Sequence, residues 1–173
     1  NDEVVEPRVR GFLVARHFKK GMPVRKGQLI FEIDDSEYYT ALLSAQAALE
    51  SSRALALEAK NNFDRAVPLA KINAISGTQL DQYTAQYAAS EADVKSARQA
   101  LRNAQLNLGY TKIYAQIDGI IESSNGSVGD YVGPGTQIPT LTTIMNIDTV
   151  QVPIAIPMTQ FLRLDSNRTN IYD

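Results

Sequence analysis

The sequence of 173 residues contains no cysteine and a single histidine, and these absences exclude several kinds of site. Without cysteine, the chain forms no disulfide, thiolate metal site or thiol nucleophile. His17 stands in a basic stretch with no second histidine in the chain, so we expect a surface turn residue and no metal site. No nucleophile, base and orienting group occur in a pattern typical of an enzyme, so we expect no catalysis.

The chain also has little net charge and no long apolar run. Its formal net charge of −2 gives no electrostatic footprint for a nucleic-acid partner, so none is expected. No apolar run approaches the roughly 20 residues that a transmembrane helix needs. No signal peptide is present, and because the chain opens at Asn1 without methionine, we expect a mature or trimmed form.

A long helical region over residues 36–109 is the most regular feature of the sequence. Small and apolar residues recur there at alternating steps of three and four, the a/d pattern of a helix packed along one partner. The first helix carries the pattern at Leu42, Ala45, Leu49, Ser52, Ala56, Ala59, Phe63 and Ala66. The second helix carries it at Leu80, Tyr83, Tyr87, Ser90, Val94, Ala97, Leu101, Ala104 and Leu108. We therefore predict an antiparallel coiled-coil hairpin with arms of roughly 30 residues, each about 45 Å long.

Local chemistry predicts where the first helix begins and ends. Asp34, Asp35 and Ser36 all offer N-caps, because their side-chain oxygens accept bonds from the free N–H groups of the first turn. Pro68 has no N–H and clashes with the preceding turn. We therefore predict that the first helix stops near Val67.

The second helix has start and stop signals of its own. Ser76 followed by Gln79 has the spacing of a capping box, which predicts the helix start. Gly109 follows the last seam residue and is expected to be the left-handed C′ glycine that ends the helix. Residues 68–77 between the two helices are predicted to form a short tip.

Short-strand segments flank the helices, over residues 4–35 and 110–145, and the second segment repeats the first. Glycines at positions needing a turn or close backbone approach recur with spacings of ten and six. They are Gly11, Gly21 and Gly27 in the first segment and Gly119, Gly129 and Gly135 in the second. Val24 matches Val132, and Ile33 matches Leu141. We predict an α+β fold in which two similar half-motifs form one β-sandwich and the helical hairpin is inserted between them.

The half-motifs resemble a known family. Residues 9–13 (VRGFL) and 21–34 (GMPVRKGQLIFEID), followed after the hairpin by residues 110–113 (YTKI) and 117–121 (IDGII), are similar to the half-motifs of periplasmic adaptor subunits. These adaptors are the membrane fusion proteins of tripartite efflux pumps, and their β domain is similar to the lipoyl/biotinyl-carrier fold. The chain departs from the family at Gln116, where a proline is usual, and we expect a looser turn there.

A true carrier domain attaches lipoyl or biotinyl to a lysine on the turn between its halves. In this chain Asp35 follows the first half-motif and the hairpin is inserted there, while Lys26 and Lys112 lie elsewhere in the pattern. We therefore expect no cofactor. A carrier domain and a generic coiled-coil oligomerisation module remain as alternatives from other classes.

The predicted tip carries the residue pattern that the adaptor family uses for docking. Arg65, Leu69 four residues on, and Ser76 seven residues further match that pattern in spacing and location. The resemblance implies docking onto a TolC-type outer-membrane channel, with Arg65 as the charged contact, Leu69 as an apolar plug and Ser76 as a hydrogen-bonding group. Each residue also has a purely structural interpretation, as a solvated arginine, a leucine packed across the turn and an N-cap.

The same resemblance implies the setting of the protein. It predicts a periplasmic adaptor, attached to the inner membrane through a segment outside this chain, that exports drugs or other small molecules. The partners would be an inner-membrane RND-type transporter, the outer-membrane channel and further copies of the chain, as a trimer or hexamer. The hairpin length favours an RND-type pump, with an ABC-type efflux or type I secretion system as the alternative.

Residues 146–173 change character. Val150, Val152, Ile154 and Ile156 alternate with more polar or smaller residues, which is typical of a strand. By resemblance, this stretch is the start of the adaptor β-barrel domain. We therefore expect a fragment of a longer adaptor, comprising the lipoyl-like domain, the hairpin and one edge of the barrel.

Overall fold

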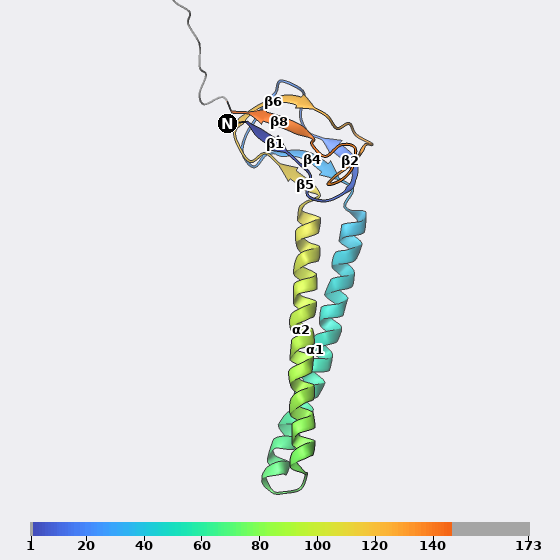
Figure 1. Ribbon diagram of the computed structural model, residues 1–173, viewed down its shortest axis with the longest axis vertical. Helices are drawn as coiled ribbons and strands as arrows, with labels where there is room; N and C mark the ends of the chain where they lie inside the picture. Colours follow the sequence, from blue (N-terminus) through green and yellow to red (C-terminus); the bar gives the residue numbers. More distant parts are fainter. Residues whose placement is uncertain (1, 147–173) are drawn as a thin grey trace, which may run out of the picture.

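The computed structural model describes residues 2–146, and these form a small β domain from which two long helices project as a rod (Figure 1). Helix α1 spans Ser36–Lys71 and α2 spans Gly77–Gly109. At 1.5 Å per residue, α1 is about 54 Å long. The predicted α+β class with an inserted helical hairpin is confirmed. The predicted barrel segment, beyond Asn146, lies outside the described residues.

Short antiparallel strands form two four-stranded sheets in the β domain. Four strands precede the hairpin: β1 (Glu3–Val5), β2 (Gly11–Arg16), β3 (Pro23–Val24) and β4 (Leu29–Ile33). Four follow it: β5 (Lys112–Tyr114), β6 (Gly119–Ser124), β7 (Tyr131–Val132) and β8 (Thr142–Met145). The strand orders are β1-β8-β6-β3 and β5-β4-β2-β7, so each sheet takes two strands from each half of the sequence.

The two halves interlock through equivalent pairings, which is the structural form of the sequence repeat. Gly11 of β2 pairs with Val132 of β7, and its counterpart Gly119 of β6 pairs with Val24 of β3. Each half therefore supplies a strand that completes the sheet of the other. Neither half closes its core alone, although the long hairpin separates them in sequence.

One part of the predicted repeat is wrong. Leu13 of β2 pairs with Ile33 of β4, whereas its counterpart Ile121 of β6 pairs with Ile144 of β8. The residue equivalent to Ile33 is therefore Ile144 and not Leu141. The second half contains three more residues before its last strand, which the matched glycines alone do not reveal.

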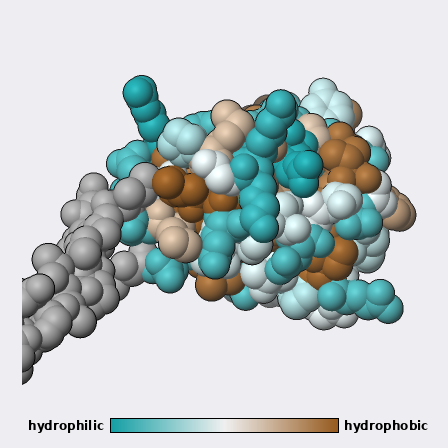
Figure 2. Space-filling view, turned by 90° about the horizontal axis from the view of Figure 1, so that it is seen from above, coloured by the Kyte–Doolittle hydropathy of each residue, from teal (hydrophilic) through white to brown (hydrophobic). Residues whose placement is uncertain are grey.

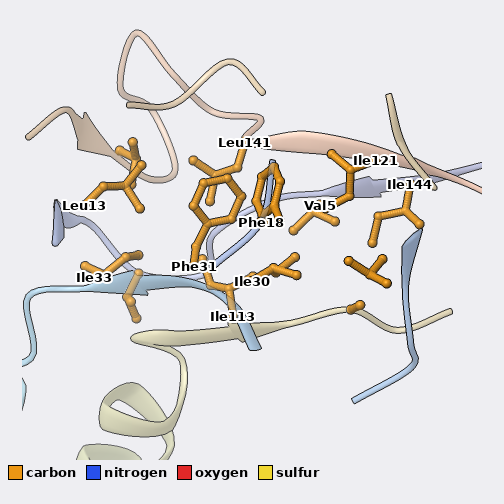
Figure 3. Packing of buried hydrophobic residues seen from close by; sticks show 14 residues of the cluster. Val5, Leu13, Phe18, Ile30, Phe31, Ile33, Ile113, Ile121, Leu141 and Ile144 are labelled. Atoms are coloured by element: carbon orange, nitrogen blue, oxygen red, sulfur yellow. The ribbon is translucent and has the colours of Figure 1, made fainter. Parts of the chain in front are cut away.

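The core lies between the two sheets and holds side chains from both halves (Figure 3). Phe18 and Phe31 meet edge to face at its centre, with ring centroids 5.0 Å apart. The buried apolar residues of the β domain are Val5, Val9, Leu13, Phe18, Val24, Ile30, Phe31, Ile33, Ile113, Ala115, Ile121, Val132, Leu141 and Ile144. Burying one such large side chain contributes about 1.5–3 kcal/mol. The core therefore stabilises the β domain from which the two helices project.

The hairpin packs through the predicted seam. All four buried residues of α1 belong to it: Leu49, Ala56, Ala59 and Ala66. In α2 the seam residues are half-buried and the remaining side chains are exposed. Phe63 and Tyr87 stack across the seam with ring centroids 5.8 Å apart. The predicted a/d seam is confirmed, and neither helix combines the length and hydropathy needed to cross a membrane.

The prediction that α1 stops near Val67 is wrong, because the helix continues through Pro68 to Lys71. Ala70 is half-buried four residues after Ala66, so the seam extends past the proline. Ile72 is the C-cap, and the left-handed backbone of the next residue, Asn73 (φ 55°), turns the chain away from the helix. Asparagine is the second choice after glycine at this C′ position.

The prediction for Gly109 is also wrong. Gly109 is the last residue of α2 and is absent from the residues with positive φ, and Tyr110 caps the helix with φ −76° and ψ −9°. The N–H of Tyr110 donates to the carbonyl of Leu106 at 3.0 Å, and Thr111 Oγ1 donates to that of Leu108 at 2.7 Å. The carbonyls of Leu106 and Leu108 are therefore satisfied without a left-handed turn.

At Gln116 the chain uses the N–H that a proline would lack. The Gln116 N–H donates to Glu3 Oε2 at 3.2 Å, which joins the segment after β5 to β1. The departure from the family pattern thus creates a bond between the two halves of the domain.

Candidate docking site at the hairpin tip

The predicted tip lies at the end of the rod farthest from the β domain (Figure 1). Its backbone is held by two bonds typical of a Schellman motif. The N–H of Asn73 donates to the carbonyl of Ala70 at 3.0 Å, and that of Ala74 donates to the carbonyl of Leu69 at 2.8 Å. The tip is therefore a turn whose backbone conformation is defined by these bonds.

Ser76 is the N-cap of α2. Its backbone is extended (φ −75°, ψ 155°), and its Oγ accepts a bond from the N–H of Gln79 at 3.1 Å. The structural interpretation of Ser76 is therefore correct, and its hydroxyl hydrogen remains as a donor. The side chain is exposed, so capping and an outside contact are compatible.

Leu69 is 43% exposed, so packing across the turn does not bury it. Ile72, three residues on, is 72% exposed. Both are large apolar side chains exposed at the end of the rod, three residues apart in the sequence, and we call Leu69 and Ile72 together the apolar knob. The sequence pattern did not single out Ile72; the available signal was an apolar residue inside a tip otherwise expected to be polar.

Arg65 has a different kind of partner from the two α1 cations that precede it in the sequence. On the shaft, Lys60 Nζ lies 2.6 Å from Asp64 Oδ2, and Arg53 Nη1 lies 2.8 Å from Glu50 Oε1. Arg65 instead donates to the neutral Asn62 Oδ1 at 2.5 Å. Among the described residues Arg65 therefore forms no ion pair, and its guanidinium is exposed one turn before Leu69.

The six glycines of the half-motifs lie at turns and strand starts. Four have positive φ: Gly21 (80°), Gly27 (82°), Gly129 (98°) and Gly135 (76°). Gly11 and Gly119 begin β2 and β6, where a neighbouring strand leaves no room for a side chain. These residues shape the β domain, far from the tip.

Two further residues considered from the sequence, His17 and Asp34, contact near neighbours at the β domain and the start of α1. His17 Nε2 lies 2.6 Å from Glu32 Oε1 on the adjacent strand. Asp34 Oδ1 accepts bonds from the Ser36 N–H at 3.0 Å and the Ser36 hydroxyl at 2.6 Å, which lowers the pKa of the Asp34 carboxyl. In residues 2–146 no three His, Asp or Glu side chains gather in a group able to hold a metal ion.

A two-half β-sandwich with a helical hairpin between the halves defines the barrel-sandwich hybrid class of domain. Residues 2–144 match the family described as "RND MFP, barrel-sandwich hybrid domain". The chain therefore belongs to the RND membrane fusion protein family.

Named relatives agree with this membership. The chain is 34% identical over 157 residues to "Multidrug resistance protein MdtA" of Proteus mirabilis, which covers 91% of this chain and 38% of the relative. It is 37% identical over 152 residues to the protein of the same name from Cronobacter turicensis, covering 87% and 37%. The chain thus spans well under half the length of these relatives.

Solved structures show the same arrangement. MacA from Actinobacillus actinomycetemcomitans superposes with a TM-score of 0.72 at 28% identity, over 83% of this chain and 49% of MacA. A MacA–MexA chimeric protein containing the Pseudomonas aeruginosa MexA α-hairpin domain gives a TM-score of 0.53 at 32% identity, over 83% and 47%. ZneB from Cupriavidus metallidurans, at 21% identity and a TM-score of 0.60, shares the fold.

Proposed function

We propose that this chain is the lipoyl-like domain and hairpin of a periplasmic, non-catalytic adaptor that links an inner-membrane RND-type transporter to a TolC-type outer-membrane channel. In this proposal the adaptor assembles from several copies and is attached to the inner membrane by a segment outside this chain. The assembly exports drugs or other small molecules. Family membership and the multidrug resistance relatives support this proposal.

The observation that carries docking is the exposed apolar knob at the end of the helical hairpin farthest from the β domain (Figure 1). Leu69 lies 43% exposed at a turn held by backbone hydrogen bonds, and one turn before it Arg65 donates to Asn62 and forms no ion pair within residues 2–146. A protein interface gains most of its affinity from a few such apolar and arginine residues. At the opposite end of the molecule, the outer surface of the β domain is mainly polar and its apolar patches are separate from one another (Figure 2).

Cysteine crosslinking in cells tests this proposal. Leu69→Cys introduces a thiol into a region that contains no other cysteine. A thiol-reactive crosslinker in the full-length protein should trap an outer-membrane channel, identified by mass. Leu57→Cys, at a side chain 60% exposed on the same helix, is the matched control and should not trap the channel.

The other outcomes separate the alternatives. Trapping only further copies of the same protein from Leu69→Cys would favour a coiled-coil oligomerisation module. Trapping a cytoplasmic enzyme, together with a lipoyl or biotinyl adduct in the intact mass, would favour a carrier domain. Either result would overturn the adaptor proposal.

A further inference from the structure

Ile72 is the most exposed large apolar side chain among the described residues, at 72%. It is the C-cap of α1, and the following Asn73 turns the chain with φ 55°. The two Schellman bonds, in which the N–H groups of Asn73 and Ala74 donate to residues before Ile72, hold this backbone in place. An exposed isoleucine on an ordered backbone loses little conformational freedom on binding, which favours a role as an anchor.

The charges around Ile72 indicate the chemistry of its partner. From Arg65 to Leu80 the sequence contains two cations, Arg65 and Lys71, and no carboxylate. Within residues 2–146 neither cation forms an ion pair, whereas Arg53 and Lys60, the other two cations of α1, are paired with carboxylates of the same helix. The tip therefore complements an apolar groove that has carboxylates at its lip.

We propose that Ile72 is a second apolar anchor for the partner channel, beside Leu69, and that Asn73 sets its direction through the left-handed turn. This inference rests on the proposed function and adds a specificity-determining residue outside the matched pattern of Arg65, Leu69 and Ser76. The occupant of this surface is the helical end of the outer-membrane channel, which would receive the two aliphatic side chains between helices and the two cations at its carboxylates.

Substitution of Ile72 in the full-length protein tests the anchor. Ile72→Ser should lower the amount of channel that co-purifies with the adaptor by about tenfold, as expected for loss of one buried anchor. Ile72→Leu should keep most of the capture because it keeps the apolar contact. Leu57→Ser removes an equally large exposed side chain from the shaft and should leave capture within about twofold of wild type.

Two variants of Asn73 test the role of the turn. Asn73→Gly keeps access to the left-handed conformation and should preserve capture. Asn73→Val makes that conformation costly, so it should redirect Ile72 and lower capture as Ile72→Ser does. Circular dichroism of each purified variant checks that the hairpin remains helical, and the Leu69→Cys crosslink in each background checks that the tip still reaches its partner.

The two proposals fail in different ways. If Leu69→Cys traps the channel but Ile72→Ser captures as much of it as wild type, the anchor is refuted and the adaptor function stands. If wild type and Leu69→Cys both fail to capture a channel, the proposed function is refuted and the anchor with it. A loss of capture in Leu57→Ser equal to that in Ile72→Ser would also overturn a specific role for Ile72.

Discussion

The Cβ that Gly11 lacks would lie 2.5 Å from Cγ2 of Ile33 on the neighbouring strand. Real Cβ atoms do not approach a carbon so closely, and Ile33 is itself only 2% exposed and has no space to move. The second half repeats this relationship, because a Cβ at Gly119 would lie 2.7 Å from Cγ2 of Ile144. Glycine is therefore required where the two half-motifs begin their long strands.

Gly11→Ala should destabilise the chain by about 1–3 kcal/mol, because the added methyl overpacks the core against Ile33. Urea denaturation of the purified protein measures the free energy of unfolding. Gly77→Ala is the matched control, because its new Cβ would have no atom within 4 Å, and it should not destabilise the protein. Equal stability of Gly11→Ala and wild type would contradict the close packing of these strands.

The same contacts show how far the repeat could be predicted from sequence. Coincident glycine spacing predicts two half-motifs, and the interlocked sheets agree with it. The counterpart of Ile33 in the second half is predicted three residues too early, at Leu141, because Leu141 and Ile144 are both apolar and the sequence does not distinguish them. In the structure both are fully buried. A difference of three residues in a loop changes neither the glycine spacing nor the apolar pattern, and only strand pairing resolves it.

In the hairpin, too, the repeated features could be predicted from the sequence and the features set at one position could not. Its seam is predictable because each a/d residue faces the partner helix over the whole length, so the pattern repeats many times. The position where α1 ends depends on opposing local contributions. The packing of Ala70 and the capping turn at Asn73 stabilise the last turn by more than the hydrogen bond that Pro68 removes. Ile72 carries no periodic signal, and its exposure follows only from the turn geometry.

The helical conformation of Gly109 reverses the expected effect of replacing it. A left-handed C′ glycine, as the sequence suggested, would make alanine destabilising. A Cβ at Gly109 would have no atom within 4 Å, and its φ is not positive. Gly109→Ala should therefore stabilise the protein by roughly 0.5–1 kcal/mol, because alanine loses less backbone entropy in a helix. Thermal unfolding followed by circular dichroism measures the change. Destabilisation by this variant would instead place Gly109 in a left-handed cap.

The close approach of the two helices is tested at Ala59, which is 5% exposed on the seam. Ala59→Leu should destabilise the hairpin by about 1–3 kcal/mol, since the larger side chain forces the helices apart. Ala54→Leu on the exposed face of α1 adds the same volume into solvent and should change stability little. Denaturant titrations of both variants separate seam packing from helix propensity. A stable Ala59→Leu variant would mean that the helices are not closely packed there.

The start of α1 gives a prediction about pH. The Ser36 hydroxyl and the Ser36 N–H both donate to Asp34 Oδ1, and they lower the pKa of this carboxyl in the folded chain. A carboxyl whose folded pKa is below its unfolded value of about 3.9 stabilises the fold above that value. That contribution is lost as the pH falls through the lowered folded pKa, because the proton weakens the acceptor.

Asp34→Asn and Asp34→Ala separate the effect of the Asp34 charge from that of its hydrogen bonds with Ser36. Asparagine keeps a neutral oxygen that accepts the Ser36 bonds, so Asp34→Asn should retain much of the stability and lose the pH dependence from this site. Alanine accepts neither bond, so Asp34→Ala should have the lowest melting temperature at pH 7. Melting temperatures measured from pH 7 to pH 2 should show the advantage of wild type over Asp34→Asn shrinking below about pH 4. An advantage that stays constant through this range would show that the Asp34 charge does not stabilise the start of α1.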